Sequence, residues 1–279
     1  MTYILLFGFC FFLFYFAAMQ SSEQKADVVV FRQISPKGKK FLLFLCCLYM
    51  ILVLGLQYYV GTDYPAYYGY FDRGTNLALY IRKKEFLFYV IATFIWLSPL
   101  PAQTGFFVFG AIQVFFLYKF ITKLKFERYD LFFLIYFTCA TCFYNQMNAL
   151  RQFTAMAIFL YAFTFLQEKK ILPYIFFVLI ASLIHNSAIL LLILYPVKKL
   201  FSLRNYKFYI VFLFICIPLM IKGLDSIITL FVQKTSYASY LTSSYFLEDN
   251  RKGFINILTK FVFFPFYLRT IYWYRKRGG

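Results

Sequence analysis

The chain alternates between apolar runs and short polar gaps, a pattern that predicts membrane segments. Several runs are shorter than the ~20 residues that cross a hydrocarbon layer, so we expect some to be short or re-entrant. We predict an all-α, polytopic transmembrane helical bundle of about 9–10 segments, forming a single integral membrane domain over residues 1–279. The segments are Tyr3–Ala18, Phe41–Val60, Phe86–Leu100, Gly105–Ile121, Leu131–Phe143, Ala149–Leu166, Ile171–Ile184, Ser187–Leu200, Phe208–Met220 and Phe254–Trp273.

Basic clusters between the apolar runs predict which loops face the cytoplasm. These clusters include Lys119–Arg128, Lys169–Lys170 and Lys198–Lys207. The last two stay on one side if Ile171–Val197 is a hairpin of two short helices, with His185 at its outer tip. The same reasoning places Tyr144–Asn148 outside. A further cluster, Lys25–Lys40, also favours the cytoplasm, which leaves Phe86–Leu100 as a re-entrant or interfacial segment.

Composition supports a membrane protein. The chain is 62% hydrophobic, whereas soluble domains are usually less than half apolar. Its net charge of +18 comes from clusters between apolar runs and not from a basic face on a soluble domain, which argues against nucleic-acid binding. Tyr3–Ala18 lacks a basic leader, so we expect an uncleaved anchor. The six cysteines lie in apolar stretches, as packing residues do.

Two groups of polar residues interrupt this pattern on the predicted outer side. Gly61-Thr62-Asp63-Tyr64 follows the second segment, and alone it is typical of a glycine turn with a solvated aspartate. Asn148, Arg151, Gln152 and Ala155 share one helical face by their spacing. An arginine inside an apolar segment either has a function or reaches headgroups by snorkelling.

A third candidate is His185, the only histidine of the chain. A lone histidine is either structural or, at a hairpin tip, able to exchange a proton near neutral pH. One histidine excludes a histidine-rich metal site, and the chain has no D-x-D motif. We therefore expect neither a metal nor another cofactor.

Four short motifs occur in order along the first two thirds or so of the chain, Tyr3 to Tyr195. They are Gly61-Thr62-Asp63-Tyr64 with Tyr67, Glu85-Phe86-Leu87-Phe88, Asn148-x-x-Arg151-Gln152-x-x-Ala155 and Ile184-His185-Asn186-Ser187-Ala188. Together they resemble the EpsG family of integral membrane proteins, relatives of the Wzy-type polymerases of bacterial exopolysaccharide, capsule and O-antigen. The chain has Gln57-Tyr58-Tyr59 where the family often has an arginine, and Phe86 where it often has proline. It is short for the family, so we expect C-terminal helices to be missing.

The resemblance implies a glycosyltransferase-type polymerase, multi-pass in the bacterial inner membrane, that joins undecaprenyl-diphosphate-linked oligosaccharide repeat units at the outer face. Such transfer requires stabilisation of the diphosphate and deprotonation of the acceptor hydroxyl. The guanidinium of Arg151 suits a diphosphate. The base is His185 or Asp63, and we favour His185 with Asp63 orienting the acceptor or the imidazole. The residues expected to bind substrate are Asn148, Gln152, Thr62, Tyr64, Tyr67 and Glu85.

Two functions of other classes remain as alternatives. One is a transporter or flippase of lipid-linked oligosaccharide, although secondary transporters usually carry internal repeats and none is recognisable here. The other is a non-catalytic membrane subunit of an exopolysaccharide synthesis complex. The expected partners are the lipid-linked oligosaccharide and the bilayer, with other polysaccharide-assembly membrane proteins as an open alternative and no nucleic acid.

Overall fold

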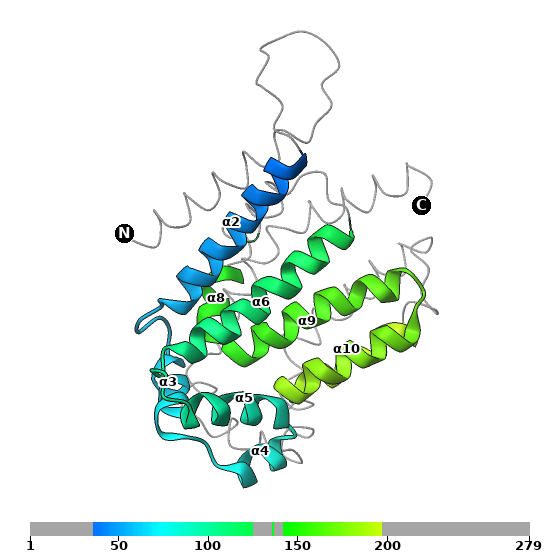
Figure 1. Ribbon diagram of the computed structural model, residues 1–279. Helices are drawn as coiled ribbons and strands as arrows, with labels where there is room; N and C mark the ends of the chain where they lie inside the picture. Colours follow the sequence, from blue (N-terminus) through cyan, green and yellow to red (C-terminus); the bar gives the residue numbers. More distant parts are fainter. Residues whose placement is uncertain (1–35, 125–135, 137–141, 197–279) are drawn as a thin grey trace, which may run out of the picture. The chain divides into compact units, whose positions relative to one another are not determined.

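The structure is a computed structural model that describes residues 36–124, 136 and 142–196. Every regular element in these ranges is helical, which confirms the all-α class for the part of the chain described (Figure 1). The helices are α2 (Pro36–Gly55), α3 (Tyr64–Arg73), α4 (Leu77–Lys83), α5 (Phe86–Leu97), α6 (Thr104–Lys123), α8 (Cys142–Asn148), α9 (Leu150–Gln167), α10 (Ile171–Ile184) and the 3-10 helix η2 (Asn186–Ile193).

Three predicted segments match helices closely, whereas Phe41–Val60 only overlaps α2, which ends at Gly55. The predicted bounds of α10 are those of the structure, Gly105–Ile121 lies inside α6, and Ala149–Leu166 is shifted by one residue as α9. Several predictions lie outside the described residues and stay predictions. They are Tyr3–Ala18, Phe208–Met220, Phe254–Trp273, nearly all of Leu131–Phe143, the basic cluster Lys198–Lys207 and the single domain over the whole chain.

Four helices form a continuous row. Helix α6 packs against α2 on one side and against α9 on the other, and α9 packs against α10. Figure 1 shows these helices side by side in that order. Van der Waals packing of their facing apolar side chains holds the row together.

Among three shorter helices, α3, α4 and α5, the last packs against each of the other two and against α10. The sequence did not predict α3 and α4, because both are short and the first is rich in tyrosine. Their stability comes from an aromatic core in which Phe71, Tyr80, Phe88, Phe106 and Phe109 are almost fully buried. This core lies beside the candidate site described below.

The chain reverses direction after α10. The Tyr174 hydroxyl, in the first turn of α10, donates to the carbonyl oxygen of Leu191 in η2, at 2.5 Å. Ala181, Ile184 and Ala188 bury one another where the two elements meet. The structure thus has the predicted helical hairpin with His185 at its tip, whereas the side of the membrane that the tip faces stays a prediction.

Within the described residues, one helix is both long and apolar enough to cross a membrane, namely α6. Shorter apolar stretches in these residues include Leu43–Gly55 of α2 and the whole of α5, which has 12 residues.

Candidate functional site

Glu85 lies at the junction of two helices, and the backbone geometry there fixes its position. Lys84 takes a left-handed conformation (φ 58°, ψ 30°) that ends α4. The amides of Lys84 and Glu85 then donate to the carbonyl oxygens of Ile81 and Tyr80, both at 3.0 Å, which is the Schellman pattern. Helix α5 starts at the next residue, so the Glu85 side chain is held between two helix ends and is buried, with 1% of the residue exposed.

Arg151 belongs to the first turn of α9 and contacts Glu85. Its Nη1 donates to Oε2 of Glu85 at 2.5 Å, and its Nε donates to the Tyr67 hydroxyl at 3.4 Å. The guanidinium carbon lies 5.8, 5.9 and 5.4 Å from the ring centroids of Tyr67, Tyr80 and Phe88, within the range of cation–π attraction. Arg151 is therefore directed inward, and the snorkelling alternative does not describe it.

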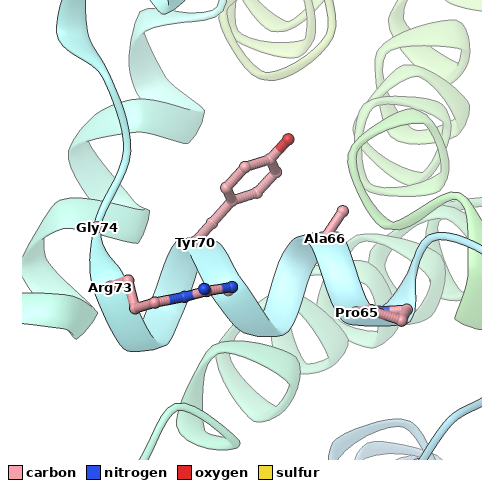
Figure 2. A pocket seen from close by; sticks show the side chains of 6 residues that line it. Pro65, Ala66, Tyr70, Arg73 and Gly74 are labelled. Carbon is pink, nitrogen blue, oxygen red and sulfur yellow. The ribbon is translucent and has the colours of Figure 1, made fainter.

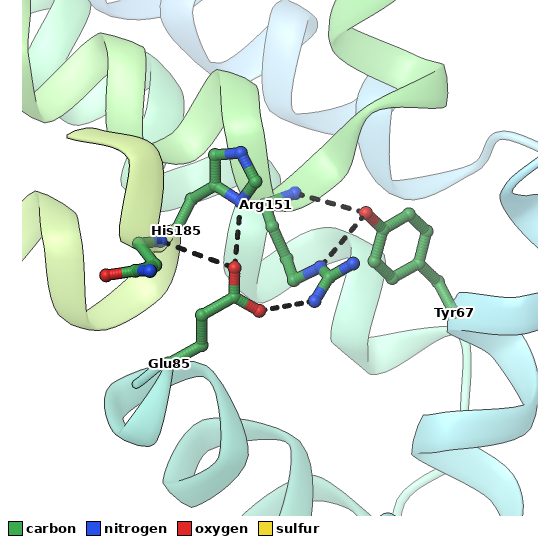
Figure 3. Close-up of polar contacts among 5 residues, drawn as sticks. Tyr67, Glu85, Arg151 and His185 are labelled. Atoms are coloured by element: carbon green, nitrogen blue, oxygen red, sulfur yellow. Dashed lines mark hydrogen bonds and ion pairs between the residues drawn. The ribbon is translucent and has the colours of Figure 1, made fainter. Parts of the chain in front are cut away.

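His185 completes the cluster from a third element. Its extended backbone (φ −143°, ψ 109°) ends α10 before η2 begins. The ring Nδ1 lies 2.9 Å from Oε1 of Glu85, and the amide of Asn186 donates to the same oxygen at 3.3 Å. One carboxylate thus joins a guanidinium with one oxygen and an imidazole with the other (Figure 3).

The charges of this cluster set the protonation of Glu85 and the tautomer of His185. Burial alone would raise the pKa of the Glu85 carboxyl, but the hydrogen bond with His185 and the charge of Arg151 together hold the pKa below its ordinary value. The carboxyl is therefore ionised at neutral pH and can only accept hydrogen bonds. A neutral His185 must then donate from Nδ1, which leaves Nε2 as a proton acceptor.

Tyr67 stays protonated beside this ion pair. Burial raises the pKa of its hydroxyl, and Arg151 lowers it by less. The neutral hydroxyl accepts hydrogen bonds from both the Nε and the backbone amide of Arg151, at 3.4 and 3.5 Å. Tyr67 therefore orients the guanidinium without competing for its charge.

A second buried polar cluster holds the start of α9. The Nε2 of Gln146, in α8, donates to Oε1 of Gln113, in α6, at 2.6 Å. The Nε2 of Gln113 donates to the carbonyl oxygen of Leu150 at 3.2 Å and to the hydroxyl of Thr154 at 2.9 Å. Leu150 precedes Arg151, so three helices are joined by side-chain bonds at the turn that carries the arginine.

The predicted polar strip of α9 is wrong in one respect. Helix α8 ends at Asn148 and α9 begins at Leu150, with Ala149 outside helical geometry (φ −90°, ψ 64°), so the strip is not one continuous helix face. Gln152 is exposed. Ala155 is buried against the α10–η2 hairpin, which agrees with the predicted close approach.

Asn148 joins the α8–α9 junction to the Gly61-Thr62-Asp63-Tyr64 turn. Its Oδ1 accepts from the Asp63 amide at 3.0 Å. Gly61 takes a positive φ of 75°, and a Cβ there would lie 2.2 Å from the same Oδ1, so only glycine fits. The turn that the sequence predicted is therefore present, and a distant side chain fixes it.

The other residues predicted from this turn have different surroundings. The Asp63 carboxylate accepts from the Thr62 hydroxyl at 3.4 Å, and among the described residues it forms no hydrogen bond with Arg151 or His185. Tyr64 is buried, stacks on Phe106 with 4.8 Å between ring centroids, and has its hydroxyl bonded to Gln103. Substrate contacts of these residues stay predictions.

From the sequence, Glu85 is expected to bind substrate, and no pattern there indicates that it joins Arg151 to His185. The only signal was an acidic residue directly before an apolar run. The Gln113–Gln146 pair was likewise missed, and the signal for it was a glutamine in the middle of an apolar segment.

Comparison with protein families identifies the chain. The EpsG family matches residues 40–278, which is most of the sequence. The chain belongs to the EpsG family. This match extends beyond the motifs that suggested the resemblance, which ended at Tyr195. Neither the comparison with curated proteins nor the one with solved structures gives a match. Membership of the EpsG family indicates a membrane-associated role in polysaccharide biosynthesis, in a lipid-linked context.

Proposed function

We propose that this EpsG protein is a polymerase that joins undecaprenyl-diphosphate-linked oligosaccharide repeat units into exopolysaccharide, capsule or O-antigen. The single observation that carries the proposal is the carboxylate of Glu85 joining Arg151 to His185. Glycosyl transfer from a diphosphate needs a cation at the leaving group and a base at the acceptor. Here one buried side chain holds both kinds of group close together.

In this mechanism His185 is the general base. The acceptor hydroxyl attacks the anomeric carbon of the donor, its proton passes to Nε2 of His185, and the bond between that carbon and the diphosphate oxygen breaks. Glu85 accepts the Nδ1–H and so keeps Nε2 free for this proton, as a carboxylate bonded to the far ring nitrogen does for other histidines. Asp63 would orient the acceptor from the turn before α3.

Arg151 stabilises the departing diphosphate. Its Nη1 and Nε are already bonded, and within the described residues its Nη2 donates to no protein group. With His185 in the neutral form that a general base requires, the charges of Arg151 and Glu85 cancel before the reaction. Once His185 has taken the proton, the cluster has a net charge of +1 at the moment when negative charge builds on the leaving group. Such preorganised charge is among the largest contributions to catalysis.

We propose further that the helices form a polytopic bundle in the bacterial inner membrane, as a single membrane domain. The large apolar side chains on the outside of the described helices support this proposal, because a soluble protein rarely exposes so many. Those more than half exposed include Phe94, Leu97, Leu172, Phe176 and Leu190. In this arrangement the hairpin tip and the Glu85 cluster face the outer side, where lipid-linked repeat units are joined.

The full-length protein, purified in detergent and supplied with a lipid-linked repeat unit, tests the function. We expect longer glycans from the wild type and none from His185→Ala, with donor binding nearly unchanged because a general base acts mainly in the transition state. Leu190→Ala, at an exposed position of η2 outside the motif, is the control and should extend glycans normally. If the protein, reconstituted into vesicles, moves the donor across the membrane without extending it, it is a flippase. If it shows neither activity, it is a non-catalytic subunit.

A further inference from the structure

A hollow in the surface of α3 is not used by the proposed chemistry. It is an open depression of about 380 Å³, a volume within the range of small-molecule sites. Its lining combines small residues, one aromatic ring, one cation and no carboxylate. The lining residues are Pro65, Ala66, Gly69, Tyr70, Arg73 and Gly74 (Figure 2).

Arg73 lies across this hollow because Gly69 has no side chain. A Cβ at Gly69 would be 2.8 Å from Nη2 of Arg73, so the guanidinium rests directly over the glycine. Figure 2 shows the Arg73 side chain running back along α3 towards Pro65. Arg73 is exposed and forms no ion pair with any described residue. Its charge is therefore available to a ligand.

The aromatic wall of the hollow is continuous with the rings around Arg151. The Tyr70 ring lies 6.1 Å from that of Tyr67 and 6.2 Å from that of Phe88, centroid to centroid. Both of those rings are within 6 Å of the Arg151 guanidinium. A ligand in the hollow is thus separated by one layer of aromatic side chains from the group proposed to hold the diphosphate.

We infer that this hollow, defined by Arg73, Tyr70 and Gly69, is a binding subsite for an acidic sugar residue of the glycan. A pyranose ring presents a flat C–H face that packs on an aromatic ring such as Tyr70, and its carboxylate pairs with a guanidinium in a bidentate manner. The small residues leave room for the ring. This inference rests on the proposed function, since it names a chemical class for the glycan on which that function acts.

Binding of defined oligosaccharides to the full-length protein in uncharged detergent tests the inference. The probes are a tetrasaccharide of alternating glucuronic acid and N-acetylglucosamine, and a neutral N-acetylglucosamine tetrasaccharide. Arg73→Gln should weaken binding of the acidic probe about tenfold or more, the effect of losing a charged hydrogen bond, and should leave the neutral probe unchanged. Gly69→Ala should also weaken binding of the acidic probe, because the new methyl group displaces the guanidinium of Arg73.

Arg82→Gln, at an exposed arginine of α4 away from the hollow, is the matched control and should bind both probes like the wild type. Equal affinities of Arg73→Gln and wild type for the acidic probe would overturn the inference. The inference would also be overturned if Arg73→Gln lost binding of phosphatidylglycerol but kept binding of the acidic sugar. The site would then hold a lipid headgroup. Loss of glycan extension in His185→Ala concerns the proposed function alone, so the two can fail separately.

Discussion

Each oxygen of the Glu85 carboxylate has its own partners. Oε2 accepts from Arg151, whereas Oε1 accepts from His185 and from the amide of Asn186. With only 2% of its side chain exposed, this charge could not remain buried without such partners. The arrangement also explains why an arginine opens the apolar helix α9, since it neutralises a carboxylate that no solvent reaches.

The shape of the Arg151 side chain matters as much as its charge. We expect Arg151→Lys to reduce polymer formation about 100-fold, the order of loss when a preorganised donor to the transition state is removed. An ammonium can contact Glu85 or the diphosphate as a point charge, but it cannot offer separate nitrogens to Glu85, Tyr67 and substrate. The readout is polymer length in a deletion strain complemented at matched membrane abundance, with Arg82→Lys as the control. Near-normal polymer from Arg151→Lys would show that the arginine does not bind the diphosphate.

The lowered pKa of Glu85 predicts how the protein responds to acid. A carboxyl whose pKa is lower in the folded state contributes stability above its ordinary pKa of about 4.5, and that contribution is lost as the pH falls through the lower folded value. Thermal unfolding in detergent between pH 7 and pH 3 should therefore show a fall in the wild type that Glu85→Gln lacks. At pH 7, Glu85→Gln should be less stable by about 3 kcal/mol, because Arg151 loses its buried partner.

The control for this titration is Glu168→Gln. Glu168 pairs with Lys123 and Lys170 at the surface, where solvent screens the charges, so its loss should change the acid response little. If Glu85→Gln and the wild type lose stability in parallel, Glu85 is not the group responsible.

Among the helices, the start of α9 depends on the bonds from α6 and α8. We expect Gln113→Leu to lower the free energy of unfolding by about 2 kcal/mol, because the buried Nε2 of Gln146 would lose its acceptor. Glycan extension should fall as well, since the turn that carries Arg151 loses two bonds. Thermal unfolding and the extension assay measure the two effects. Phe115→Leu, at an exposed position of α6, should alter neither the free energy of unfolding nor glycan extension. If Phe115→Leu lowers both as much as Gln113→Leu does, the bonds of Gln113 are not the cause.

Sequence patterns predicted those helices that consist of an almost uninterrupted run of apolar residues. Helix α10 is such a case, with a run of apolar residues between Lys170 and His185. Helices α3 and α4 could not be predicted because their buried residues pack on other helices, Phe71 on α6 and Tyr80 on α5. A new segment was predicted from Ala149, close to the start of α9, but α8 was missed because Tyr144–Asn148 was predicted to be a connection.

The sequence predicted the individual residues of the candidate site but not the contacts between them. Spacing along one helix can show that Arg151 and Gln152 are polar neighbours, but it says nothing of which distant residue they meet. The contacts of Glu85 with Arg151 and His185 join residues 66 and 100 positions apart. Such pairs arise from the packing of α5, α9 and α10, and no local pattern encodes them.

For the whole molecule, the hairpin reading predicts on which side of the membrane each loop lies. In a cysteine-free background, single cysteines at Asn186 and Arg204 should react with a membrane-impermeant thiol reagent from opposite sides, the first from outside and the second from the cytoplasm. Labelling of both from one side would show that the segment between them does not reverse as proposed. The outward-facing site would then be wrong as well.

The Schellman turn that fixes Glu85 also has a consequence for how the protein is made. Glu85 leaves the ribosome 66 residues before Arg151 and 100 residues before His185. At bacterial synthesis rates of about 5–20 residues per second, its carboxylate lacks the arginine for roughly 3–13 s and the histidine for roughly 5–20 s. During that interval it must stay hydrated or be shielded by the insertion machinery. A nascent chain that stops before α10 should therefore contain the Glu85–Arg151 ion pair without the histidine. Such chains should be the first that membrane proteases degrade in vivo.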